Sequence, residues 1–346
     1  MMLIGCDFHP SWQQVNWLDT ETEETGERKL VQASGDAERF YRQVAAPALI
    51  GMEATGNSHW LVDLLSELGH ELWVGDAAQI RASYVRQQKT DQRDAAHLLK
   101  LLVEGRFPRI WMPSSEVRDL RQLLLHRYKL VIIRARVKNE LQHLCLNKGV
   151  QRKHKLWSQA GQQILRELPL QPWAGRRRDD LLKLMAMLDQ QIEPLDQAVK
   201  AEAQRDKMAL LLQTQPGVGA ITALAYVLTL GDVSRFPRGK QVASYLGLIP
   251  REHSSGGRQK LGAITKQGNR MLRILLMEAA QAAVRYDPQF HREYLHRCHS
   301  KPKAVAKVAA ARKLAVRLYW MLRTQRPYPD IVRIESSPRV PLVGAS

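Results

Sequence analysis

The N-terminal stretch of the chain begins with three short apolar runs. They occupy residues 2–6, 13–18 and 29–33, and their composition predicts strands. Only turn-length gaps separate the runs, so the three strands are expected to pair as a β-meander. A polar helix is predicted next, near residues 36–44.

Strand and helix patterns then alternate along the chain. Residues 48–52 and 71–74 predict two further strands, a helix is expected between them at 58–68, and helical patterns run from about 77 to 104. The order β-β-β-α-β-α-β-α favours a mixed sheet covered by helices, because the first three strands are consecutive. This order resembles that of the ribonuclease H-like architecture, an α/β fold.

The middle of the chain, from residue 114 to about 203, has a helical pattern. Apolar residues recur at heptad-like spacings in two stripes, which predict a coiled-coil-like pair of helices. Two prolines and a glycine within 169–178 separate the stripes, so an antiparallel hairpin that serves as a dimerisation arm or spacer is the simplest interpretation. The stripes consist of Leu123, Leu130, Val137 and Leu144, and of Leu181, Met185, Leu188, Ile192, Leu195 and Val199.

A second globular region follows residue 205. Glycine, proline or serine interrupts its apolar helical stretches at 215–219, 231 and 247–262, and the region is expected to be mainly α-helical. Prolines at and after residue 327 predict a flexible end. The expected parts are an α/β domain at 1–112, a helical arm at 113–205, a mainly α-helical domain at 206–327 and a flexible tail at 328–346.

The charge of the chain is high and uneven. Its 346 residues include 52 Lys and Arg against 34 Asp and Glu, a formal net charge of +18, which favours a polyanionic partner such as nucleic acid. Residues 1–112 carry 11 basic and 16 acidic side chains, a net charge of −5, and the remainder carries +23. This division predicts metal chemistry in the front part and phosphate binding in the rear.

The cysteine pattern and the hydropathy exclude several classes of protein. The three cysteines lie far apart with no C-x-x-C pair, so neither a disulfide framework nor a cysteine-rich zinc site is expected. The longest uncharged stretch, 209–231, is broken by Gln, Pro and Gly, and no membrane-spanning helix is expected. Asp7 and His9 interrupt any signal-peptide core. A reducing cytoplasm is therefore the expected location.

Four carboxylates are candidates for a shared site. Asp7 and Glu53 each end an apolar run, so they are expected to emerge from the ends of neighbouring strands, while Asp91 and Asp94 lie three apart on one helix face. Such a cluster repels itself unless hard cations neutralise it, and its oxygen ligands suit Mg²⁺ or Mn²⁺ bridging substrate phosphates. Singly, the strand acids also fit loops, and Asp91 fits a first-turn acid after the N-cap candidate Thr90.

Several short motifs resemble those of one family, the DEDD insertion-sequence transposases. That family has a RuvC-like first domain and a C-terminal transposase domain. Piv-type DNA invertases are its nearest relatives whose reaction has a different biological outcome. The resemblance spans most of the chain. The motifs are Ile4-Gly-Cys-Asp7, Gly51-Met-Glu-Ala-Thr-Gly56, Lys89-Thr-Asp-Gln-Arg-Asp-Ala95, Gln215-Pro-Gly-Val-Gly219, Ala243-Ser-Tyr-Leu-Gly-Leu-Ile-Pro250, Ser254-Ser-Gly-Gly257 and Lys266-Gln-Gly-Asn-Arg270.

The resemblance implies that the four acids bind Mg²⁺ and that a serine attacks DNA. Ser255 matches, because the family's serine comes directly before glycine and at a fixed distance after the Gly-Leu-x-Pro turn; the sequence alone leaves its neighbour Ser254 open. A serine hydroxyl needs activation by a metal or a base, and a phosphoserine intermediate would conserve the phosphodiester energy for rejoining. Without the resemblance, the serines fit a flexible turn.

Basic residues surround the candidate serine, and the turn at 215–219 has two interpretations. The basic residues are candidates for charge-assisted bonds to phosphates, although part of the set is expected to be a solvated face. The turn fits tight helix packing or a helix-hairpin-helix contact with phosphate. The basic candidates are Arg251, Arg258, Lys260, Lys266, Arg270 and Arg273.

The resemblance also implies partners. Members of the family act on donor and target double-stranded DNA with a structured bridge RNA whose loops pair with both, so that RNA specifies the sequence. They form tetramers in which different subunits supply the two domains of one active site, although the sequence itself leaves assembly within one chain open. A nucleoid-associated location in a prokaryotic cell follows from this function.

Two other functions stay open from the residues alone. A RuvC-like structure-selective nuclease would use the four acids and water without the serine. A noncatalytic nucleic-acid scaffold would need neither. A tyrosine recombinase is disfavoured because the chain contains no His-x-x-Arg.

Overall fold

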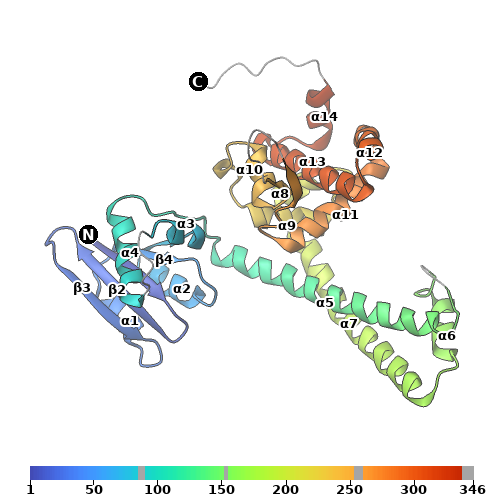
Figure 1. The fold of residues 1–346 in the computed structure, drawn as a ribbon, viewed down its shortest axis with the longest axis horizontal. Helices are drawn as coiled ribbons and strands as arrows, with labels where there is room; N and C mark the ends of the chain where they lie inside the picture. Colours follow the sequence, from blue (N-terminus) through green and yellow to red (C-terminus); the bar gives the residue numbers. More distant parts are fainter. Residues whose placement is uncertain (85–89, 152–154, 253–259, 337–346) are drawn as a thin grey trace. The chain divides into compact units, whose positions relative to one another are not determined.

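The chain divides into two units, Met1–Ser115 and Glu116–Ser346 (Figure 1). The computed structural model describes residues 1–84, 90–151, 155–252 and 260–336. Within these ranges, no helix has the length and apolar character needed to cross a membrane.

Five strands in the first unit form one mixed sheet, in the order β3-β2-β1-β4-β5. β1, β2 and β3 are antiparallel neighbours, whereas β4 runs parallel to β1 and β5 runs parallel to β4. The structure therefore confirms the predicted meander and the mixed-sheet α/β fold class. The strands are β1 (Met2–Phe8), β2 (Trp12–Asp19), β3 (Thr25–Val31), β4 (Leu49–Glu53) and β5 (Glu71–Gly75).

Strand β3 lies earlier in the sequence than its predicted range of 29–33. Its position at the edge of the sheet explains the difference, because an edge strand needs little apolar surface. Leu30 is its one buried residue, and the charged residues 27–29 are exposed. The strand therefore has almost no apolar signature.

Helices cover both faces of the sheet. On one face, α1 and α2 pack with Ile4, Cys6, Ile50 and Met52 into an apolar core. On the other face, α4 packs on β1, β2 and β4, and with α3 it forms a smaller core around Phe107. The helices are α1 (Asp36–Gln43), α2 (His59–Glu67), α3 (Ala77–Ala82) and α4 (Asp91–Val103).

Two glycines set how closely α4 approaches the sheet. Gly5 and Gly51 are partners in the β1–β4 register. A Cβ at Gly5 would lie 2.2 Å from the carbonyl oxygen of Ala95 and 2.4 Å from the amide nitrogen of Leu99, both in α4. One at Gly51 would lie 2.9 Å from the side chain of Leu102, also in α4. The missing side chains therefore fix the distance between helix and sheet.

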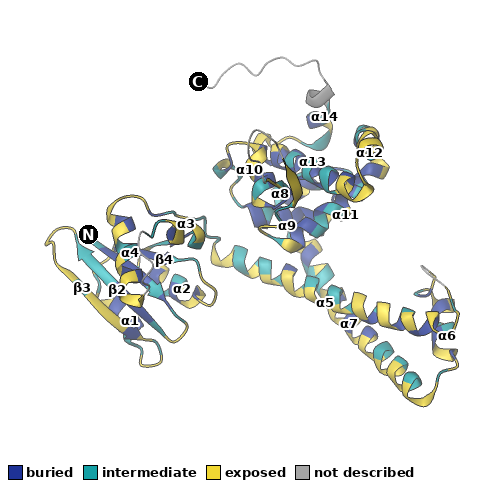
Figure 2. Cartoon of the chain, viewed as in Figure 1, coloured by how far each residue is buried: buried dark blue, intermediate teal, exposed yellow. Residues whose placement is uncertain are grey.

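Two long antiparallel helices, α5 and α7, form an arm in the second unit. Ion pairs join Arg134 to Asp189 at 2.8 Å and Arg177 to Glu140 at 2.7 Å. Residues of the predicted stripes fill the apolar contact between the helices, and much of the remaining arm is exposed (Figure 2). The arm consists of α5 (Ser115–Leu146), α6 (Gln159–Glu167) and α7 (Pro172–Arg205).

The rest of the second unit is a helical domain around a large apolar core. The arm contributes Leu124, Val199 and Ala203 to this core. The mainly helical character confirms the predicted fold class. The elements are α8 (Lys207–Gln213), α9 (Ala220–Leu230), the short η1 (Val233–Arg235), α10 (Gly239–Tyr245), α11 (Arg270–Tyr286), α12 (Pro288–Ser300) and α13 (Lys303–Thr324).

A buried ion pair ties α12 to α13. Asp287 caps α12 by accepting hydrogen bonds from the backbone amides of Gln289 and Phe290. Its other oxygen accepts a bond of 2.8 Å from Arg317, and both side chains are 1% exposed. Removing one partner of such a pair typically costs about 3–5 kcal/mol, because the other charge stays buried.

The turn at 215–219 packs tightly against α11. Gly217 has a φ of 87°, and a Cβ there would lie 2.6 Å from the carbonyl oxygen of Ala279 and 2.5 Å from the amide nitrogen of Ala283. This close approach favours the packing interpretation of the turn.

A small two-stranded sheet appears where the sequence predicted only a break in the helices. Strands β6 (Pro250–Glu252) and β7 (Leu261–Ile264) pair antiparallel; β6 lies within the stretch 247–262, and β7 begins in it and ends at Ile264. Strands this short carry no periodic apolar pattern. The segment 253–259 between them lies outside the described residues.

Helix α14 (Tyr328–Ser336) lies where the prolines predicted the start of a flexible tail. Ile331 is buried against the apolar core, and the Tyr328 amide donates a hydrogen bond of 2.9 Å to Thr214 Oγ1. These tertiary contacts hold a helix that the local sequence pattern did not indicate.

We expect Gly5→Ala to lower the free energy of unfolding of the protein by about 1–3 kcal/mol or more, because the new methyl group overlaps the α4 backbone. Gly56→Ala is the matched control, since a Cβ at Gly56 meets no atom within 4 Å. Urea unfolding of both variants measures the difference. Equal stabilities would show that α4 does not depend on this contact.

Candidate metal centre

Two carboxylates stand side by side at the ends of β1 and β4. The register pairs Cys6 with Met52, so Asp7 and Glu53 come next in line, on strands about 4.8 Å apart. Cys6 and Met52 fill the core on one face of the sheet. Because successive side chains of a strand point to opposite faces, Asp7 and Glu53 point to the face that α4 covers. Both are half-buried.

The first turn of α4 supplies the other two carboxylates. Thr90 caps the helix, its Oγ1 accepting a hydrogen bond of 3.4 Å from the Arg93 amide, and Asp91 and Asp94 follow. Asp94 is 6% exposed, whereas the Asp91 side chain is 55% exposed. The free amides of a helix N-terminus interact favourably with negative charge, so the first turn accommodates both acids.

The carboxylates perturb one another electrostatically. Burial raises the pKa of Asp7 above its ordinary value, the charges of Asp94 and Asp91 raise it further, and His9 opposes the shift. Repulsion among buried like charges is the condition that a bound cation relieves.

Tyr84 connects Asp94 to the two strand acids. Its hydroxyl donates a hydrogen bond of 2.5 Å to Asp94 Oδ1. Burial raises the pKa of Tyr84 far above its ordinary value, as does the bond to Asp94, with further contributions from the charges of Asp7 and Glu53. The charges of the strand acids therefore act on the same hydroxyl that binds Asp94.

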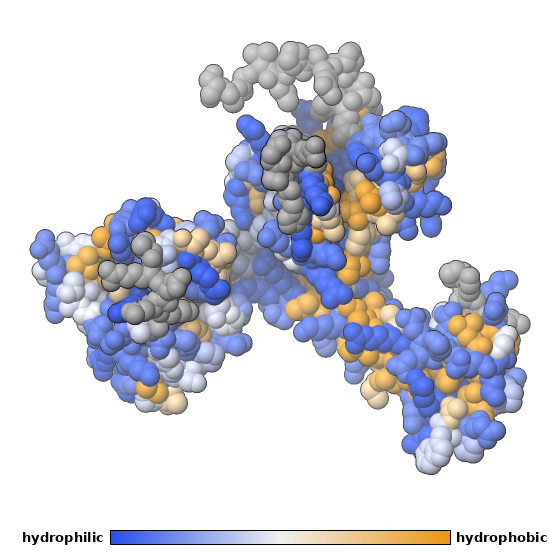
Figure 3. All heavy atoms as spheres, viewed as in Figure 1, coloured by the Kyte–Doolittle hydropathy of each residue, from blue (hydrophilic) through white to orange (hydrophobic). Residues whose placement is uncertain are grey.

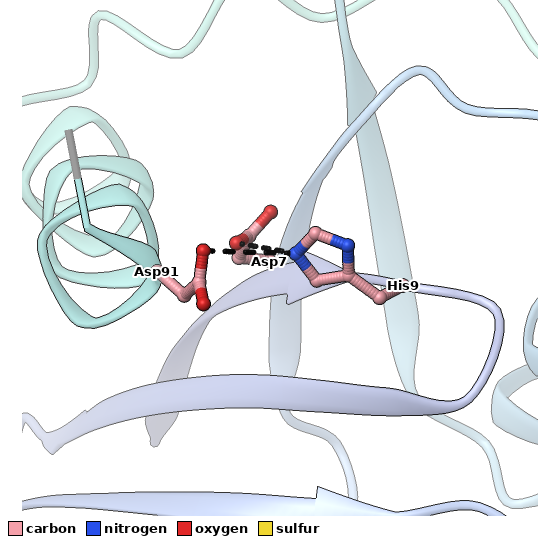
Figure 4. Close-up of side chains that lie close together, drawn as sticks. All are labelled: Asp7, His9 and Asp91. Carbon is pink, nitrogen blue, oxygen red and sulfur yellow. Dashed lines mark hydrogen bonds and ion pairs between the residues drawn. The ribbon is translucent and has the colours of Figure 1, made fainter.

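His9 lies between Asp7 and Asp91 (Figure 4). Its Nε2 is 3.2 Å from Asp7 Oδ2 and 3.9 Å from Asp91 Oδ1. One potential ligand atom of each residue lies within 4.8 Å of the other two. Carboxylate oxygens at this spacing fit a divalent cation.

The sequence did not single out His9 or Tyr84. Its position two residues after Asp7 could have indicated His9, because side chains two residues apart in extended backbone point to the same face. Nothing comparable marks Tyr84, which meets Asp94 only through the tertiary fold.

Asp7 and Glu53 belong to a row of neighbouring residues that crosses the strands, and this row continues to the edge strand β3. Gln14 is the β2 partner of Asp7, and Lys29 is the β3 partner of Gln14. A pocket of about 390 Å³ beside this row is lined by both residues and by Trp12 and Asp91, among others. The Lys29 ammonium lies 4.3 Å from the centre of the Trp12 ring. The row therefore ends in a positive charge.

The candidate nucleophile Ser255, its neighbour Ser254 and Arg258 lie outside the described residues. The other candidate phosphate contacts are on both sides of the segment 253–259 or at the start of α11. Four of them, Arg251, Lys260, Lys266 and Arg270, are exposed.

The structure corrects the prediction for Arg273. This residue is 7% exposed, and its guanidinium donates hydrogen bonds to the carbonyl oxygens of Leu246 and Gln267. Those two residues lie in turns whose backbones are in close contact at Gly247, where a Cβ would lie 2.3 Å from the Gln267 carbonyl oxygen. Arg273 therefore joins two turns in the interior, a role that sequence spacing does not distinguish from a surface cation.

The fold and the four gathered acids define the class of the first unit. It is a ribonuclease H-like domain of the DEDD type, and a model of DEDD-type IS110 transposases matches residues 4–148. The DEDD type implies a divalent metal. In the rear part, the model described as "Transposase IS116/IS110/IS902 family" matches residues 209–295.

Curated relatives cover most of the chain. A probable family 20 transposase of Pseudomonas aeruginosa is 31% identical over 82% of this chain and 84% of its own length. The transposase for insertion sequence element IS1111A of Coxiella burnetii is 30% identical over 59% of this chain and 57% of its own length. The pilin gene-inverting protein of Moraxella bovis is 27% identical over 80% of each. The chain belongs to the IS110/IS116/IS902 family of transposases, and as a transposase it binds DNA.

We expect Asp7→Asn to raise the free energy of unfolding at neutral pH in the absence of divalent cations. The native pKa of Asp7 is raised, so ionising Asp7 lowers stability as the pH rises through that pKa, and a neutral side chain avoids this loss. The gain should disappear below the ordinary carboxyl pKa of about 3.9, where Asp7 is protonated in both states. Urea unfolding across this pH range measures it.

The control for this prediction is the exposed Glu67→Gln on α2, which should leave stability unchanged. Added Mg²⁺ should raise the melting temperature of the wild type and of the control but not that of Asp7→Asn. An equal rise in all three proteins would contradict a metal centre at Asp7.

Proposed function

We propose that this transposase cleaves and rejoins DNA strands through a covalent phosphoserine on Ser255, next to Mg²⁺ or Mn²⁺ held by the four carboxylates. The observation that carries the proposal is the register that sets Asp7 beside Glu53, on the sheet face that the first turn of α4 meets. We assign the metal to residues 1–112, subunit spacing to the arm at 113–205, and the nucleophile to residues 206–327.

The reaction exchanges one phosphate ester for another. Ser255 Oγ attacks the scissile phosphorus, an Oγ–P bond forms, the bond to the leaving oxygen breaks, and that oxygen takes up a proton as the serine loses one. In rejoining, the hydroxyl of a second strand attacks the phosphoserine, and Ser255 leaves with a proton. A bound divalent cation neutralises the carboxylates and withdraws charge from the phosphate.

The chain's own residues position the strand around this exchange. Carboxylates at the ends of two hydrogen-bonded strands and on a capped helix are held rigidly, which favours an in-line geometry. We assign contacts with neighbouring phosphates to Lys29 in the first unit and to the exposed Arg251 and Arg270 in the second.

The partners in this proposal are donor and target double-stranded DNA and a structured guide RNA. The net charge of +23 beyond residue 112 supports binding of more than one polyanion. In the family that the motifs resemble, base pairing to a bridge RNA selects the DNA sequence. We assign the same division here, in which the protein binds backbones and the RNA specifies sequence.

We further propose that the protein works as a tetramer whose serine and carboxylates come from different subunits. Apolar residues on the face of the arm in view in Figure 3 support self-association. The exposed apolar residues of α5 and α7 are Leu125, Ile133, Leu146, Trp173, Leu184 and Met187.

Wild-type protein with Mg²⁺, end-labelled element-junction DNA and RNA from the native locus is expected to give a protein–DNA adduct that survives denaturation. Ser255→Ala should abolish the adduct, and Asp7→Ala should reduce it by orders of magnitude, while Ser254→Ala retains it. Gel electrophoresis under denaturing conditions measures the adduct. Cleavage by Ser255→Ala without an adduct would identify a metal-dependent nuclease, and unchanged binding with no cleavage by any variant would identify a scaffold.

Mixing the two inactive variants Asp7→Ala and Ser255→Ala should restore strand exchange, because a mixed tetramer contains active sites with an intact serine from one subunit and intact carboxylates from another. Each variant alone serves as the control. Activity no higher than that of the separate variants, in mixtures shown to exchange subunits, would indicate that each chain builds its own site.

A further inference from the structure

His9 is held in place by three contacts that are independent of the carboxylates. Its backbone amide donates a hydrogen bond of 2.9 Å to Trp12 O, and its carbonyl accepts one of 2.7 Å from Gln32 Nε2. Its ring stacks on Trp12 with ring centres 4.2 Å apart and planes 27° apart. These contacts direct Nε2 toward Asp7 and Asp91 (Figure 4).

The spacing around His9 is that of ligands on one ion. Neighbouring ligands of an octahedral ion with bonds of about 2.1 Å lie about 3 Å apart, and opposite ligands lie about 4.2 Å apart. His9 Nε2 is 3.2 Å from Asp7 Oδ2 and 3.9 Å from Asp91 Oδ1, and the three potential ligand atoms lie within 4.8 Å of one another. A single cation can therefore contact all three with only small movements.

We infer that His9 is a direct metal ligand, so that an imidazole nitrogen joins the carboxylates of Asp7 and Asp91 on an ion of this centre and the centre retains Mn²⁺ more tightly than Mg²⁺. This inference rests on the metal centre of the proposed function and adds to it a ligand and a preference between ions. Nitrogen ligands favour first-row transition ions, whereas Mg²⁺ prefers oxygen. The alternative role for His9 is a hydrogen bond that orients Asp7 without contact to the metal.

Pulsed electron paramagnetic resonance on the full chain with one equivalent of Mn²⁺ distinguishes the two roles, because only a directly bonded imidazole gives a strong ¹⁴N coupling to the ion. The wild type should show this coupling. His9→Gln should lose it, and His59→Gln, which changes an exposed histidine of the same unit, should retain it. Circular dichroism confirms that each variant is folded.

Calorimetric titration with Mn²⁺ and with Mg²⁺ provides the second measurement. His9→Gln should raise the Kd for Mn²⁺ roughly tenfold or more, and the Kd for Mg²⁺ by a smaller factor, so the preference for Mn²⁺ falls. If His9 only makes a hydrogen bond to Asp7, its loss should weaken the binding of both ions by the same factor.

The outcomes separate this inference from the proposed function. Suppose that Asp7→Asn abolishes Mn²⁺ binding. The metal centre then stands, but the assignment of His9 is overturned if the wild type shows no ¹⁴N coupling or if His9→Gln retains the coupling. If Asp7→Asn binds Mn²⁺ as tightly as the wild type, the carboxylate centre itself is wrong.

Discussion

The contact of the α4 backbone with Gly5 is the constraint on which the candidate site depends. The strand register fixes Asp7 and Glu53 relative to each other, but nothing in the sheet fixes Asp91 and Asp94. Their position follows from how near α4 lies to β1, and atoms of Ala95 and Leu99 occupy the space that a side chain at Gly5 would fill. One residue separates this glycine from Asp7, so one short segment supplies both the site's first acid and the contact that brings the helix acids to it.

Gathering like charges is unfavourable, and the first unit contains the groups that offset it. The first turn of α4 presents helix amides to two of the acids. Tyr84 donates a hydrogen bond to Asp94, and His9 lies against Asp7 and Asp91. The pKa of Asp7 is nevertheless raised, first by burial and then by the charges of Asp94 and Asp91. A divalent cation bound at these carboxylates would neutralise part of their charge and would stabilise the folded state.

The second unit has a different organisation. Its core is apolar, and the buried pair of Asp287 and Arg317 joins α12 to α13. Arg273 joins the turn that precedes β6 to the turn that follows β7.

The sequence alone determined the succession of strands and helices and the mainly helical rear part, and it singled out the four acids as candidates, because apolar periodicity and acids at strand ends depend on local positions in the chain. Tertiary structure decided the rest. Strand β3 and helix α14 exist through contacts with distant residues, and the burial of Arg273 depends on two turns that no local pattern brings together. His9 and Tyr84 likewise lie at the site because of contacts between residues of different elements. A side chain's partners across the fold follow from register and packing distance, and these are set only when the whole chain has folded.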